Sequence, residues 1–140
     1  MATINLLLLV ILGSITPPVY ADQGIGTVFS SNDVYNPNPV TACTGKKLID
    51  SDLVIAHRTL KCGEEVIVCT KRNLKCAKAR VIDRGPYGIR GSDYTSILDM
   101  SIGLQKKIEH NGFEEVFLFS PSEIKKIRPK KNDSKNRRIS

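Results

Sequence analysis

The chain has 140 residues, 21 of them Lys or Arg and 14 Asp or Glu, with a formal net charge of +7; this length allows one domain. No stretch after residue 21 is apolar and long enough to cross a bilayer, so no transmembrane segment is expected. The four cysteines form no CxxC pair, which argues against a zinc site; we predict no metal and no cofactor.

Residues 1–21 predict a cleavable signal peptide. The apolar run at 6–12 is too short to span a membrane, prolines at 17–18 end any helix, and Ala21 offers a small residue for cleavage. The alternatives are a buried N-terminal strand or an uncleaved anchor. No cysteine precedes Cys43, so no lipid anchor is expected at the cleavage site. The sequence thus predicts a periplasmic or secreted protein.

The rest of the chain reads as a mostly β domain over residues 22–120. The expected strands cover residues 24–29, 40–43, 53–56, 65–70, 75–82 and 115–119. A helix is expected from an N-cap at Ser101 to a stop at residues 111–112. Many short strands separated by turns favour a closed barrel.

Residues 121–140 predict a basic, disordered tail. They hold eight Lys or Arg and two acids, which leaves the rest of the chain close to neutral. Such a tail suits an anionic wall polymer or a membrane surface. Binding to nucleic acid would be salt-sensitive and blind to sequence, and an exported protein more often meets wall polymers, so nucleic acid is not an expected partner.

Two ionisable residues at strand ends are candidate catalytic groups. Asp83 ends an apolar strand before a Gly-Pro turn, where partial desolvation lets a carboxyl group keep its proton and act as a general acid. The structural alternative is that it caps the turn through backbone amides. His57 follows an apolar strand, and its alternative is a structural histidine. Asp99 is also explained as an acid at a helix N-terminus.

Three stretches resemble the rare lipoprotein A family: AHRTLKCGEEVIV at 56–68, ARVIDRGPYG at 79–88 and ILDMS at 97–101. The resemblance implies a six-stranded double-psi β-barrel with one short helix. It also implies lytic transglycosylase cleavage of peptidoglycan, in which one carboxyl group protonates the leaving oxygen and the sugar's own 6-hydroxyl makes a 1,6-anhydro end. By this likeness Asp83 is the acid and base, and His57 orients Asp83 or the substrate.

Further residues near these motifs are candidate substrate contacts: Lys46, Asp50, Arg84, Tyr87 and Asp99. The family usually has a Gly-Glu pair eleven residues before the histidine, whereas this chain has Gly45 and Lys46. Asp50 is the nearest acid that can replace that Glu. A positive charge beside Asp83 would stabilise its carboxylate and weaken it as an acid, which favours a non-catalytic alternative.

The cysteines resemble those of expansins and plant natriuretic-peptide-like proteins. An even number in an exported chain predicts two disulfides, and spacing alone leaves three pairings open. The likeness to these proteins implies Cys43–Cys62 and Cys69–Cys76. It also supplies the alternative function, a monomeric barrel that binds and loosens wall polysaccharide without cleaving it.

Overall fold

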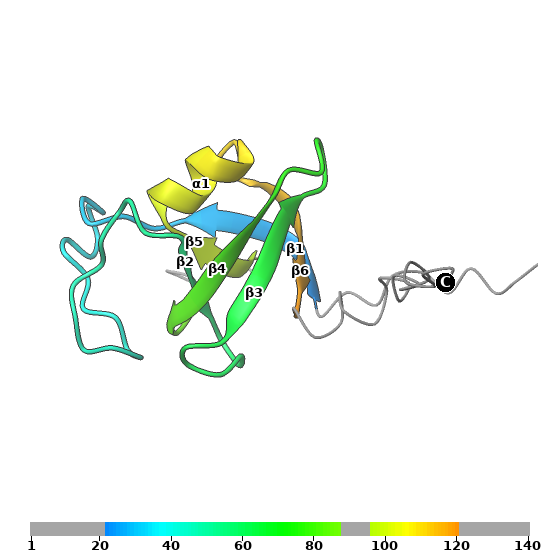
Figure 1. Cartoon of the computed structure of the whole chain (residues 1–140). Helices are drawn as coiled ribbons and strands as arrows, with labels where there is room; N and C mark the ends of the chain where they lie inside the picture. The colour runs from blue at the N-terminus through cyan, green and yellow to red at the C-terminus, as the bar shows by residue number, and fades with distance from the viewer. Residues whose placement is uncertain (1–21, 88–95, 121–140) are drawn as a thin grey trace, which may run out of the picture.

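The computed structural model describes residues 22–87 and 96–120, in which six strands form a closed barrel with one short helix. The expected signal peptide and basic tail lie outside the described residues. The elements are β1 (Asp22–Val28), β2 (Val54–His57), β3 (Glu65–Thr70), β4 (Cys76–Asp83), β5 (Ser96–Met100), α1 (Ile102–Ile108) and β6 (Glu114–Phe119). The predicted mostly β barrel is therefore confirmed, and Figure 1 shows α1 over one end of it.

The strand order around the barrel is β1-β5-β2-β4-β3-β6. The pairs β1–β5 and β2–β4 are parallel, and the other four pairs are antiparallel. Exchanging the first three strands with the last three reproduces the same circular order and the same parallel pairs. The barrel therefore has an internal pseudo-twofold arrangement.

One predicted strand is wrong and one was missed. Residues 40–43 form only an isolated bridge, Val40 with Lys47, inside a long loop that reaches β2. Residues 96–100, for which no strand was expected, form β5 between two strands of the barrel. Asp99 consequently lies on a strand, and its explanation as an acid of the helix N-terminus is wrong.

The barrel interior is filled by aliphatic side chains from β2 to β6 and from α1. The core consists of Ile55, Val66, Val68, Ala79, Val81, Leu98, Met100, Leu104, Ile108, Val116 and Leu118. In β1, Gly26 brings the backbone close to the core, because a Cβ there would lie 3.1 Å from Met100 and Val116 atoms. The first strand thus closes the barrel with backbone rather than with large side chains.

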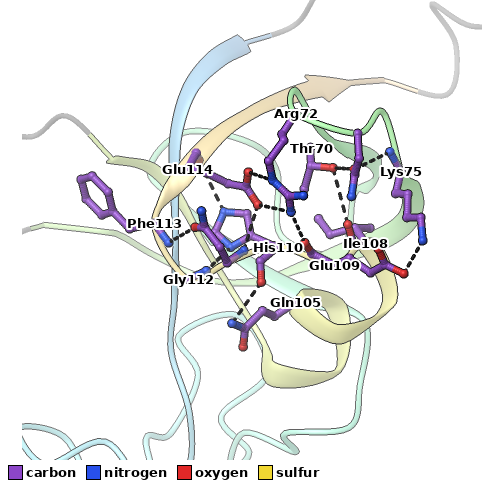
Figure 2. Close-up of polar contacts among 12 residues, drawn as sticks. Thr70, Arg72, Lys75, Gln105, Ile108, Glu109, His110, Gly112, Phe113 and Glu114 are labelled. Carbon is purple, nitrogen blue, oxygen red and sulfur yellow. Dashed lines mark hydrogen bonds and ion pairs between the residues drawn. The ribbon is translucent and has the colours of Figure 1, made fainter.

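Helix α1 begins at the predicted N-cap, since the Ser101 hydroxyl accepts a hydrogen bond from the Leu104 amide. It ends earlier than expected, because Glu109 adopts a left-handed conformation and caps it. Arg72, from the β3–β4 turn, donates to the Glu109 carbonyl (2.7 Å) and to Glu114 Oε2 (3.0 Å) (Figure 2). These contacts join the hairpin to the helix end.

Gly103 sets how closely α1 approaches the preceding loop. Its amide donates to the Asp50 carbonyl, and a Cβ at this position would lie 2.4 Å from the Ser51 carbonyl oxygen. Gly103→Ala is expected to lower the free energy of unfolding by about 2 kcal/mol, because rigid backbone must move. Urea unfolding measures this change. A variant as stable as the parent would show that the loop moves away freely.

Candidate functional site

A row of registered residues crosses four strands of the barrel. Thr27 pairs with Asp99, Asp99 pairs with Ala56, and Ala56 pairs with Asp83. Registered neighbours point to the same face of a sheet, so the two carboxyl groups flank the small side chain of Ala56. This arrangement leaves space between them.

That space is a cavity of about 160 Å³, lined by strand residues and by the loops that follow β1 and β4. Its lining residues are Phe29, Ser30, Asp33, Asn36, Pro39, Ala56, Asp83, Arg84, Gly85, Pro86, Tyr87 and Asp99. Of the predicted site residues, the cavity brings together Asp83, Arg84, Tyr87 and Asp99. Among the described residues it has three carboxyl groups and an aromatic residue, Tyr87, that is 57% exposed. Lys46, Asp50 and His57 are not among its lining residues.

Asp99 has the most perturbed environment in the cavity. Burial raises the pKa of Asp99 above the ordinary range of a carboxyl group, while a hydrogen bond from the Thr27 hydroxyl acts in the opposite direction. The negative charges of Asp33 and Asp83 raise this pKa further. Asp99 is thus the cavity carboxyl group best suited to hold a proton.

Asp83 also has structural contacts. Its Oδ1 accepts hydrogen bonds from the backbone amides of Ala42 (2.7 Å) and Arg84 (2.8 Å). The neighbouring Cys43 amide donates to the Ile82 carbonyl (3.0 Å), so the carboxyl group helps to hold the loop before β2 against the end of β4. Oδ1 of Asp83 therefore has the structural, turn-capping role, while the residue also lines the cavity.

His57 lies elsewhere. It is buried, its Nδ1 accepts from the Thr59 and Leu60 amides (both 3.1 Å), and its Nε2 is 3.7 Å from Asp22 Oδ2. Burial lowers the pKa of His57, the charge of Asp22 partly offsets this, and the charges of Arg58 and Arg84 lower it again. Among the described contacts none joins His57 to Asp83, so the structure gives no support to an orienting role through direct contact.

The two candidates on the loop before β2 have separate positions. Both carboxylate oxygens of Asp50 accept hydrogen bonds from Ser31, one from its amide and one from its hydroxyl, each at 2.7 Å. Asp50 therefore holds two loops together. Lys46 is exposed, and its backbone carbonyl accepts from the Thr41 amide. Neither residue reaches the cavity.

The structure contains the two disulfides that the resemblance implied, Cys43–Cys62 and Cys69–Cys76. Disulfides are typical of proteins in oxidising compartments outside the cytoplasm. Within residues 22–87 and 96–120, no cluster of three or more His, Cys, Asp or Glu has the arrangement of a metal site. No helix in this part of the chain is long and apolar enough to cross a membrane.

Asp33 and Thr27 also belong to this site, although no sequence motif indicated them. Asp33 belongs to the loop after β1, where its Oδ1 accepts from the amides of Tyr35 (2.8 Å) and Asn36 (3.3 Å). Nothing in a polar SSND segment distinguishes such a turn-forming acid from one that faces a cavity. Thr27 contacts Asp99 only because β1 and β5 are parallel neighbours.

No protein-family model matches the chain, and the search of the curated proteins gave no match. Among solved structures, a Streptomyces papain inhibitor is similar to this chain, with a TM-score of 0.50. The alignment covers 74% of this chain and 99% of the inhibitor, with 19% sequence identity. At this identity the likeness concerns the fold, which is a small barrel.

Proposed function

We propose that the protein cleaves peptidoglycan glycan strands as a lytic transglycosylase and that Asp99 carries the proton. The observation behind this proposal is that Asp99 is a partly buried carboxyl group with a raised pKa that faces a cavity with Asp83. The motifs shared with the rare lipoprotein A family contribute both residues. The pseudo-twofold strand order supports the double-psi assignment.

The proposed step needs one carboxyl group that starts protonated. Asp99 gives its proton to the glycosidic oxygen as the bond from that oxygen to the anomeric carbon breaks. The 6-hydroxyl oxygen of the same sugar then bonds to the anomeric carbon, and its proton returns to Asp99. No water is consumed, so the step needs no second carboxyl group to activate a water molecule. Asp83, as an anion nearby, stabilises the positive charge that develops on the sugar.

The substitution of Lys46 for the family glutamate has less effect on this scheme than the sequence indicated. Lys46 does not line the cavity, and its charge is not among those that act on Asp99. The proton carrier is also a different residue from the one assigned by sequence. The scheme therefore requires no acid at position 46.

A second candidate is a barrel that binds wall polysaccharide without cleaving it. It is favoured by the structural contacts of Asp83 and Arg84, because Arg84 donates to the carbonyls of His57 (3.0 Å) and Leu60 (2.5 Å) rather than into the cavity. The papain inhibitor has a similar fold, so a protein ligand is an outcome that the same experiment can detect.

The test is to incubate the full chain with purified glycan strands and to analyse the products by mass spectrometry. Anhydro-ended fragments are expected from the parent and from Asp52→Asn, a control that removes an exposed acid outside the cavity. No fragments are expected from Asp99→Asn. Cleavage that survives Asp99→Asn would reject the assignment of the proton carrier. Glycan binding without products would favour the second candidate, and inhibition of papain without glycan binding would favour a protein ligand.

A further inference from the structure

The ring of His57 is bonded to the turn that follows its own strand. Nδ1 accepts hydrogen bonds from the amides of Thr59 and Leu60, both at 3.1 Å. A ring nitrogen that accepts carries no proton, so the neutral ring has its proton on Nε2. Only 8% of the side chain is exposed, and solvent therefore cannot easily replace these bonds.

Charged groups face the ring from three elements. Asp22 on β1 has its Oδ2 3.7 Å from Nε2, which is too long for a direct hydrogen bond but close enough for attraction to a charged ring. Arg58 from the turn and Arg84 from the end of β4 carry the opposite sign and repel a charged ring. A protonated His57 would therefore be drawn towards β1.

Arg84 connects the same turn to the cavity by hydrogen bonds. Arg84 Nη1 donates to the carbonyls of His57 (3.0 Å) and Leu60 (2.5 Å), and Nη2 lies 3.1 Å from Cys62 Sγ. Arg84 also lines the cavity. The turn is thus fixed from one side by the imidazole and contacted from the other by a guanidinium group of the candidate site.

We propose that protonation of His57 opens the turn at residues 58–60 and releases Arg84, which makes His57 a pH-sensitive positioning residue of the cavity. The added proton comes from solvent and binds Nδ1, because Nε2 already has one. Nδ1 then becomes a donor that faces two other donors, so both amide bonds are lost and the ring gains Asp22 as its partner. The inference goes beyond the proposed function and does not depend on glycan cleavage.

Two substitutions at His57 separate the effect of protonation from the effect of losing the hydrogen-bond acceptor. His57→Asn places an amide oxygen near the position of Nδ1, so an acceptor for the two amides remains but cannot be protonated. His57→Gln places its amide near the position of Nε2 and leaves the Thr59 and Leu60 amides without an acceptor. Asn is therefore expected to keep the turn closed at every pH, and Gln to leave it open at every pH.

His110 provides an internal control at the other end of the barrel. Its Nδ1 accepts from the Gly112 amide at 3.0 Å, as Figure 2 shows, and burial lowers its pKa as well. The Gly112 amide should therefore respond to acid in the same way as Thr59 and Leu60. Its response should be identical in the parent and in both His57 variants.

The experiment measures amide hydrogen-exchange protection in the full chain by nuclear magnetic resonance, with correction for the intrinsic pH dependence of exchange. Between about pH 7.5 and about pH 4.5, protection of the Thr59 and Leu60 amides should fall about tenfold or more in the parent, as the acceptor is lost. It should stay constant in His57→Asn and be low throughout in His57→Gln. The Arg84 side-chain resonances should shift together with the turn.

Unchanged protection of Thr59 and Leu60 in the acidified parent would overturn the inference. So would a loss of protection in His57→Asn with the same midpoint as in the parent. The parent titration decides the question even if a variant does not fold. Because no glycan is present, failure of the proposed enzymatic function would leave these results unaffected.

Discussion

Asp99→Asn is expected to make the protein more stable at neutral pH while removing cleavage of glycan strands. The folded state raises the pKa of Asp99, so it binds a proton more tightly than the unfolded state does. Protonation of Asp99 therefore contributes to the free energy of unfolding. The contribution is fully present below the pKa of Asp99 in the unfolded state, and it is lost as pH rises through the pKa in the folded state. Ionisation of Asp99 is therefore less favourable in the folded than in the unfolded state, and removing the ionisable group should add on the order of 1 kcal/mol at pH 7.

The measurement is urea unfolding of the parent and of Asp99→Asn over a pH series. The gain should be present at pH 7 and should shrink towards acid pH, where the parent carboxyl group is protonated. Asp52→Asn is the matched control, because Asp52 is exposed and outside the cavity. A variant less stable than the parent at pH 7 would show that the contact with Thr27 outweighs the cost of burial. Since native sites often sacrifice stability for chemistry, a gain would support a functional role.

Replacing both Cys43 and Cys62 with serine is expected to cost about 3 kcal/mol of unfolding free energy, from the chain entropy of a loop with a sequence separation of 19. The bond also holds the long loop that carries Ala42, whose amide donates to Asp83. The double variant should therefore unfold at lower urea concentration and show a disturbed cavity. Equilibrium unfolding under non-reducing conditions measures the difference.

The matched control is replacement of Cys69 and Cys76, which are 7 residues apart and directly paired in the β3–β4 hairpin. This bridge closes a shorter loop that strand pairing already holds together, so its loss should cost less. Equal losses for the two bridges would contradict the account based on loop length. A larger loss for the hairpin bridge would show that strand pairing there depends on the bond.

The local signals in the sequence predicted most of the barrel. The β-branched run in 65–70, the short turn after it and the return segment 75–82 mark a hairpin, and Ser101 marks the start of a helix. There is a physical reason why residues 96–100, and not the predicted residues 40–43, form a strand of the barrel. Residues 96–100 end next to a helix N-cap, and only pairing with β1 and β2, both distant in sequence, makes them a strand.

The candidate site was only partly predictable for the same reason. Motifs pointed to Asp83 and its neighbours, but the difference between Asp83 and Asp99 depends on burial and on nearby charges. These follow from the register across four strands. The turn around His57 shows a further limit, because an AHRTL segment does not reveal whether the ring faces the cavity or its own turn.

The place of β1 in the barrel has a consequence for how the chain folds. Its partners are β5 and β6, so the first strand pairs only with the last two strands of the domain. No partial chain that stops before β5 can satisfy it, and barrel closure waits until β6 is present. Such long-range pairing makes folding slow compared with local hairpins. Completion of the barrel is therefore expected only after the whole domain has left the ribosome.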